Sequence, residues 1–126
     1  MPVYDTELFN PPAPLAQVTL RNPANGSILS NVLMLLDFGA DVTLIPQACM
    51  EPLGAVAIPD KYYELESFEG SISLSSVVRL ELKFLERTFR GQFLLADKKW
   101  GVMGRNILNA ISLLMDGPHL MWKEQR

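Results

Sequence analysis

The chain has 126 residues, a formal net charge of −3 and 48% hydrophobic residues. This length suits one domain, and the composition is ordinary for a folded globular protein, which excludes a disordered chain. Only 11 residues are basic, and no basic run is longer than Lys98-Lys99, so a nucleic-acid partner is not expected.

The cysteine count and the apolar runs bear on the compartment. With a single cysteine, Cys49, no internal disulfide can form, so the fold does not depend on an oxidising compartment. The N-terminal segment lacks the apolar core of a secretory signal, and the longest apolar run, residues 32–36, is far shorter than the roughly 20 residues of a membrane span. We therefore expect a soluble, cytoplasmic protein without a membrane partner.

The first part of the chain predicts an arm followed by short strands. Residues 1–14 are rich in proline, which lacks the N–H that a strand interior needs, so we expect an extended arm there and a domain over residues 15–126. Residues 15–21 alternate in part between apolar and polar side chains, which favours a strand. Residues 22–26 end in Asn-Gly and predict a turn, and residues 28–36 predict the next strand.

The strand predicted at residues 28–36 becomes wholly apolar from residue 32, which indicates burial on both faces. Residues 37–41, Asp-Phe-Gly-Ala-Asp, interrupt the apolar pattern before residues 42–45 resume it. Residues 46–53 predict a short helix, with proline in the first turn and glycine just after the end. Cys49 lies among apolar residues of this helix, so we expect a buried structural thiol.

The second half predicts more strands, with turn signals at short intervals. In residues 77–84, apolar side chains at 78, 80, 82 and 84 alternate with charged ones. The overall pattern predicts an all-β domain, barrel-like or sandwich-like, with one or two short helices. The remaining predicted elements are strands at 62–68 and 88–96, a very short one at 102–103, a helix at 105–111 and a closing hairpin over 112–122.

Asp37 is the most informative residue of the sequence. An apolar strand leads into it, and a second apolar strand follows shortly after. An ionised carboxylate in such surroundings is costly unless a partner stabilises it or it takes up a proton. Gly39 permits a tight turn and close approach of another backbone. The pattern therefore predicts a lone acid at a strand end, on a turn between apolar walls, although a turn-capping acid without catalytic function fits the residues as well.

Two segments resemble those of a known family. Residues 35–45, Leu-Leu-Asp-Phe-Gly-Ala-Asp-Val-Thr-Leu-Ile, are similar to the active-site segment of retropepsin-like (retroviral-type) aspartic proteases. Residues 101–108, Gly-Val-Met-Gly-Arg-Asn-Ile-Leu, resemble the second signature of that family. The resemblance covers roughly residues 15–123 and implies a closed-barrel-like acid-protease fold, in a small stand-alone form with one domain per chain.

The resemblance implies a homodimeric aspartic endopeptidase that acts on a peptide or protein substrate. Each copy would supply one Asp37 carboxylate. Two carboxylates so close together cannot both ionise easily, so one would keep its proton. The ionised carboxylate would take a proton from a water molecule held between them, while the protonated one would donate to the peptide carbonyl oxygen. No cofactor would be required.

Other roles follow from the resemblance position by position. Asp41 and Arg105 match positions that form an ion pair beside the active-site loop, and Thr43 would tie that loop to neighbouring backbone. Gly70 falls at the tip of a hairpin that closes over bound peptide. The residues expected to bind substrate are Gly39, Asp41 and Gly70, and those expected to support the site are Phe38, Ala40, Thr43, Gly104 and Arg105.

Phe38 departs from the family pattern, which has Thr or Ser at this position. The hydroxyl there makes hydrogen bonds across the dimer axis, and a phenyl ring cannot. An alternative is therefore a catalytically weakened or inactive member of the fold that serves as a dimerisation or peptide-binding module. A chain that is largely monomeric when dilute is a third possibility.

The other chemistry-bearing residue types indicate no competing site. One histidine, His119, and one cysteine make neither a metal site nor a Cys-His catalyst plausible. His119 lies in the last predicted hairpin, where a surface or interface position is expected. Trp100 and Trp122 are expected in the core or in a dimer interface.

Overall fold

The polypeptide folds mainly into strands. The structure is a computed structural model that describes residues 2–67 and 69–126. Mostly β-structure with a few short helices was the predicted fold class, and it is confirmed. The helical segments are η1 (Gln47–Cys49), α1 (Met50–Leu53) and α2 (Arg105–Leu108). The strands are β1 (Tyr4–Asp5), β2 (Ala13–Arg21), β3 (Ile28–Leu36), β4 (Leu44–Pro46), β5 (Tyr62–Glu66), β6 (Ile72–Phe84), β7 (Arg87–Ala96), β8 (Gly101–Met103), β9 (Leu113–Asp116) and β10 (Met121–Glu124).

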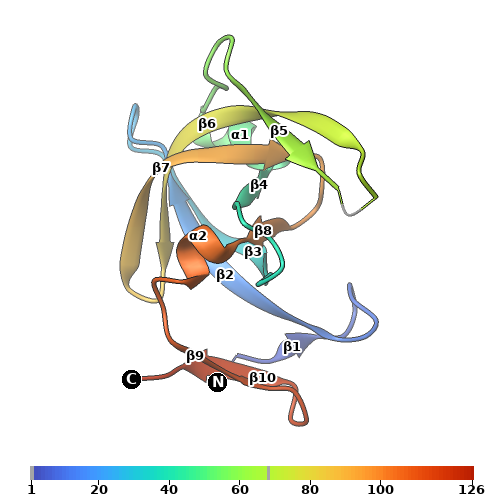
Figure 1. Ribbon diagram of the computed structural model, residues 1–126. Helices are drawn as coiled ribbons and strands as arrows, with labels where there is room; N and C mark the ends of the chain where they lie inside the picture. Colours follow the sequence, from blue (N-terminus) through green and yellow to red (C-terminus); the bar gives the residue numbers. More distant parts are fainter. Residues whose placement is uncertain (1, 68) are drawn as a thin grey trace.

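The main sheet has eight strands in the order β1-β2-β3-β8-β4-β7-β6-β5. β2 also pairs with β6 through Thr19–Lys83, Leu20–Leu82 and Arg21–Glu81. Strands β2, β3, β8, β4, β7 and β6 therefore form a closed ring, from which β1 and β5 extend (Figure 1). β9 and β10 form a separate antiparallel hairpin below this ring in Figure 1.

The inner face of β6 shows how the sequence pattern builds the core. Val78, Leu80, Leu82 and Phe84 are each at most 3% exposed, as the alternation predicted. Each buried aliphatic or aromatic side chain contributes about 1.5–3 kcal/mol to folding. These side chains belong to one cluster of buried residues that also includes Leu20, Met34, Ile45, Leu53, Met103, Leu108 and Trp122.

β3 has the bounds that the sequence predicts, but its burial differs from the prediction. Val32, Met34 and Leu36 are buried, whereas Leu33 and Leu35 are only half-buried. Burial on both faces was therefore wrong. Leu33 faces a cavity that the N-terminal arm covers only in part, so this face of β3 keeps contact with solvent.

The helical segment after β4 also follows the prediction. Pro46 precedes η1, and Gly54, in the left-handed conformation (φ 57°), ends α1. Cys49 is a free, buried cysteine, and burial raises the pKa of its thiol. The predicted burial of this thiol is therefore confirmed. The second helix, α2, ends at Leu108 and is shorter than predicted.

The N-terminal arm contacts the rest of the protein at both of its ends. Tyr4 N donates to Leu120 O (2.7 Å), which joins the arm to the β9–β10 hairpin. Further along, the Phe9 ring packs edge-on against Trp100, with 4.7 Å between ring centroids. β2 begins at Ala13, and the division into an arm and a domain at residue 14 stays a prediction. No helix in residues 2–67 and 69–126 is long and apolar enough to cross a membrane.

The closing hairpin carries one buried and one exposed residue that the sequence singled out. Trp122 of β10 is 2% exposed and donates its Nε1–H to Leu15 O (3.3 Å), so it belongs to the core. His119 lies in the turn, exposed, with its Nδ1 close to the Asp116 carboxylate. A surface position for the histidine is therefore confirmed.

Candidate active site

Strand β8 brings the two motif segments together although they are far apart in the sequence. It pairs in parallel with β3, where Leu36 aligns with Met103, and antiparallel with β4, where Leu44 aligns with Val102. Because β8 lies between β3 and β4, the loop of residues 37–43 that connects these two strands passes the end of β8 (Figure 1). The chain after β8 must then turn directly beside this loop.

Asp37 is the first residue of that loop and is half-buried. Its backbone N–H donates to Met103 O (3.0 Å), which continues the β3–β8 pairing by one residue. Its carboxylate Oδ1 accepts the Gly39 N–H (2.9 Å), and its carbonyl accepts the Ala40 N–H (3.2 Å). The loop thus folds tightly around Asp37 and fixes the direction of its carboxyl group.

The second segment holds the loop from the other side. Arg105 N donates to Ala40 O (2.8 Å), and the Arg105 guanidinium donates through Nη1 to Phe38 O (2.7 Å). The structure therefore brings together Phe38, Ala40 and Arg105, three of the residues that the sequence named as support for the site.

Arg105 does not, however, pair with Asp41. Among the ion pairs of the described residues, none joins these two side chains, and Asp41 is exposed. The guanidinium is engaged instead by the Phe38 carbonyl, which the tight turn at Gly39 directs toward it. The ion pair expected from the family resemblance is absent from this structure.

Thr43 links the loop to the start of α2. Its hydroxyl donates to Asn106 Oδ1 (2.7 Å) and accepts the Gly104 N–H (3.1 Å), and the residue is only 2% exposed. The sequence predicted that Thr43 ties the loop to neighbouring backbone. No role was predicted for Asn106, although this residue is part of the second motif. The buried Thr43 hydroxyl needs a hydrogen-bond partner, and the Asn106 side chain supplies it.

Gly104 allows the two segments to approach each other. A Cβ atom at this position would lie 2.2 Å from Val42 O, which is closer than real Cβ contacts. The backbone conformation of Gly104 is extended (φ −92°, ψ −177°), so any residue could adopt it. Close packing, and not backbone freedom, therefore explains the glycine.

Gly70 lies at the tip of the β5–β6 hairpin, as the sequence predicted. It has φ 86°, donates to Ser67 O (2.9 Å), and sits in a turn where Ser67 N donates to Ser71 O (2.8 Å). Phe68, the last residue of the strand predicted at 62–68, lies outside the described residues. The hairpin exposes four large apolar side chains: Tyr62, Ile72 and Leu74 on one face and Tyr63 on the other.

A cavity of about 280 Å³ separates this hairpin from the loop. Val42 and Thr43 of the loop line it on one side, and Lys61 and Tyr63 line it on the other. The cavity thus extends from the candidate catalytic loop toward the strand β5. Its remaining lining residues are Val77, Gln92, Leu94 and Asn106.

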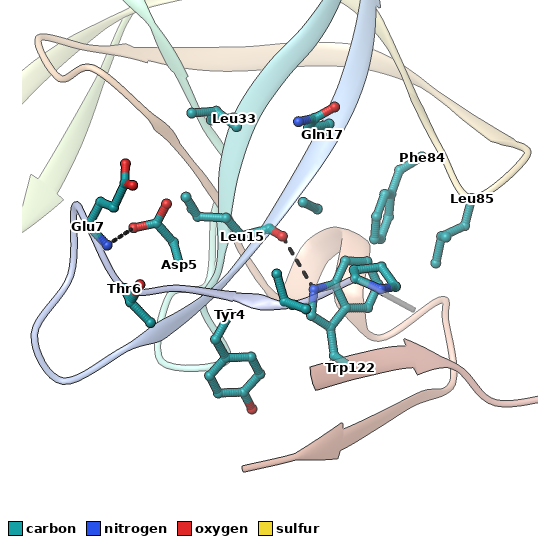
Figure 2. Close-up of a pocket in the computed structure, with 13 residues that line it drawn as sticks. Tyr4, Asp5, Thr6, Glu7, Leu15, Gln17, Leu33, Phe84, Leu85 and Trp122 are labelled. Carbon is teal, nitrogen blue, oxygen red and sulfur yellow. Dashed lines mark hydrogen bonds between the residues drawn. The ribbon is translucent and has the colours of Figure 1, made fainter. Parts of the chain in front are cut away.

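A larger cavity, of about 690 Å³, lies away from Asp37 between the arm and β2. Figure 2 shows Phe84 and Trp122 at one end of it and Asp5 and Glu7 at the other. Asp5 Oδ1 accepts the Glu7 N–H (2.9 Å), so this carboxylate is engaged in the turn of the arm. The larger of these two cavities is therefore not the one beside the candidate catalytic loop.

The groups gathered at the loop restrict the chemistry that it can perform. Within the described residues, no three His, Cys, Asp or Glu side chains come together to hold a metal ion. Asp37 is the acid that the turn holds in place, and the buried Cys49 and the exposed His119 belong to other parts of the fold. At this loop, one copy of the chain therefore presents one carboxyl group held by a hydrogen bond, suited to proton transfer when a second such group faces it.

Comparison with known proteins gives a consistent result at the level of fold. No family model and no curated protein sequence matches the chain. Among solved structures, EIAV protease complexed with the inhibitor HBY-793 is similar, with a TM-score of 0.57 and 21% identity over 78% of this chain and 86% of that one. The foamy viral protease-reverse transcriptase in complex with an RNA/DNA hybrid has a TM-score of 0.53 and 19% identity over 76% of this chain. The match spans 12% of that longer chain. The chain therefore has the retropepsin-like fold of the retroviral proteases.

Proposed function

We propose that the chain is a homodimeric aspartic endopeptidase in which Asp37 of each copy supplies one of two catalytic carboxylates. The observation that carries the proposal is the position of Asp37, at the end of β3 in a loop that β8 and Arg105 hold in place, in a chain with this fold. Because one copy holds one such acid, the second must come from a second copy.

The proposed reaction needs only the two carboxylates and one water molecule. Two acids that meet at a twofold axis cannot both ionise easily, so one keeps its proton. The ionised carboxylate takes a proton from the water as it attacks the peptide carbonyl carbon. The protonated carboxylate donates to the carbonyl oxygen, which gives a tetrahedral intermediate without a covalent bond to the enzyme.

The proposed substrate is an extended peptide that lies between the loop and the β5–β6 hairpin. The Gly39 carbonyl and the exposed Asp41 stand on the loop side, and Gly70 stands at the tip of the hairpin that closes over the peptide. Of the exposed apolar side chains of the hairpin, Tyr63 lies on the face that lines the cavity beside the loop, whereas the register places Tyr62, Ile72 and Leu74 on the opposite face. The Tyr63 ring therefore favours an apolar residue in the peptide, because burying the ring against the peptide removes it from water.

An exposed strand edge supports association of two copies. β9 pairs with β10 on one side, and in the part of the chain that the structure describes, no strand pairs with its other side. Unpaired strand edges are templates for pairing with a second chain. Leu114 of β9 is 42% exposed, so pairing of this edge would also bury apolar surface.

Cleavage of a mixed peptide pool at acidic to neutral pH tests the proposal. The parent chain, Asp37→Asn and the matched control Asp60→Asn are compared at equal concentration; Asp60 is exposed and lies outside the site. We expect the parent and the control to cleave and Asp37→Asn to lose activity by at least 100-fold, because general acid–base catalysis contributes about 10²–10⁴-fold. If neither the parent nor its Phe38→Thr form cleaves any peptide while folded and dimeric, the enzyme proposal is wrong.

Phe38 favours a second candidate function, a dimeric peptide-binding module without turnover. The phenyl ring cannot make the cross-axis hydrogen bonds that a hydroxyl makes in the family, so the carboxylates would be held less rigidly. Under this alternative, Asp37→Asn dimerises and binds peptides as the parent does, and Phe38→Thr restores no cleavage.

A further inference from the structure

Phe38 presents an apolar ring to solvent at the tip of the loop that holds Asp37. The residue is 47% exposed, and its carbonyl is held by Arg105 Nη1 at 2.7 Å. The backbone on either side is also fixed, because Asp37 N donates to Met103 O and Gly39 N donates to Asp37 Oδ1. The exposure of the ring is therefore a property of a well-held loop, next to a half-buried acid.

We infer that Phe38 is the central apolar contact between two copies of this chain, ring against ring at the twofold axis. The inference rests on the proposed function, because the twofold axis is the one at which two Asp37 carboxylates meet. Consecutive Cα atoms are about 3.8 Å apart, so the residue after Asp37 lies within side-chain reach of the same axis. At a twofold interface a residue on the axis meets its own equivalent, so Phe38 faces Phe38 of the second copy.

The chemistry of the ring suits this position. Aromatic pairs favour offset-stacked or edge-to-face contact, and aromatic residues near the centre of an interface dominate its binding energy. The ring pair would also exclude water beside the carboxylates, which strengthens electrostatic interactions there. Where the family uses a polar contact across the axis, this chain would use an apolar one.

Association measured by sedimentation over a concentration series tests the energetic claim. We compare the parent with Phe38→Ala and with Val56→Ala, which also trims an exposed apolar side chain, 81% exposed and distant in sequence from the loop. We expect Phe38→Ala to raise the dimer Kd by at least tenfold, because each dimer loses two central rings. Val56→Ala should change the Kd less than twofold. An unchanged or lower Kd for a folded Phe38→Ala overturns the inference.

A thiol at position 38 tests the geometric claim without relying on affinity. The native Cys49 is buried, so Phe38→Cys carries one accessible thiol, and Val56→Cys serves as the control. A disulfide requires Cα atoms about 4.4–6.8 Å apart. We expect mild oxidation to cross-link Phe38→Cys into a covalent dimer and to leave Val56→Cys largely uncross-linked. A dimeric Phe38→Cys that is cross-linked neither by oxidation nor by a bis-maleimide reagent long enough to replace the two rings overturns the inference.

These measurements separate the inference from the proposed function. A parent that cleaves peptides and dimerises while Phe38→Ala keeps its Kd contradicts the inference alone. A parent that dimerises through Phe38 and cleaves nothing contradicts the proposed activity alone. A parent that is monomeric at every concentration contradicts both, because each needs the second copy.

Discussion

Replacement of Gly104 by alanine tests the packing that joins the two motif segments. The new Cβ atom would lie 2.2 Å from Val42 O, 2.7 Å from Val42 C and 2.9 Å from Val42 N. All three are backbone atoms, so no side chain can rotate away to make room. To reach an ordinary contact of about 3.4 Å, the Val42 carbonyl must move by about 1.2 Å (3.4 − 2.2).

Such a movement has a cost that can be estimated. Overpacking in a dense interior costs about 1–3 kcal/mol. The shift would also stretch the 3.1 Å hydrogen bond from Gly104 N to the Thr43 hydroxyl, which contributes about 0.5–1.5 kcal/mol. We therefore expect Gly104→Ala to lower the free energy of unfolding by about 2–4 kcal/mol and the Tm by roughly 10 °C or more.

Thermal and urea unfolding measure this effect, with Gly117→Ala as the matched control. A Cβ atom at Gly117 would meet no atom within 4 Å, and its φ is not in the left-handed region. The control should unfold within about 1 kcal/mol of the parent, since Gly→Ala at a compatible site changes stability by about 0.4–1 kcal/mol. Equal stability of the two variants would refute the close approach of Gly104 to the Val42 backbone.

Three further substitutions test other contacts. Thr43→Val should cost about 1–3 kcal/mol in urea unfolding, because it leaves the Gly104 N–H buried without a partner; a variant as stable as the parent would contradict the bridge. Trp122→Phe removes the hydrogen bond from the buried indole N–H to the Leu15 carbonyl of β2 and should lower the free energy of unfolding by about 1–2 kcal/mol in the same assay. An unchanged free energy of unfolding would contradict this buried hydrogen bond. The hydrogen bond from Arg21 lowers the pKa of Glu81 below its usual range. The ionised Glu81 carboxylate therefore stabilises the fold above about pH 4.3, and this stabilisation is lost as the pH falls further. Glu81→Gln should therefore be less stable than the parent at neutral pH and equal to it in acid; a difference that grows in acid would contradict this sign.

Elements with a strong local pattern were predictable from the sequence. The β3 strand, the alternating inner face of β6 and the helical segment before Gly54 follow from apolar periodicity and from turn residues. The first residues of β6 were missed although Ile72 and Leu74 alternate with serines, because here the apolar side chains are exposed and a serine, Ser75, is buried, the reverse of the usual pattern. Pairing with β5 completes this segment as a strand.

Contacts between distant segments were not predictable from local pattern. The half-buried state of Leu33 depends on the arm, whose β1 pairs with β2 and whose Phe9 packs on Trp100. In the candidate site, the two motif segments were found by resemblance, whereas the partner of Arg105 was not. Its hydrogen bond to Phe38 O depends on the direction of a single carbonyl group, which no sequence pattern specifies.

The central claim is that each active site contains one Asp37 from each of two copies. It is tested most directly by mixing the parent with Asp37→Asn at constant total concentration, above the dimer Kd, and measuring the rate of peptide cleavage. If both carboxylates are required, the rate falls as the square of the parent fraction, so an equal mixture keeps about a quarter of the full rate. A rate that falls in proportion to the parent fraction, so that an equal mixture keeps about half, would contradict the claim.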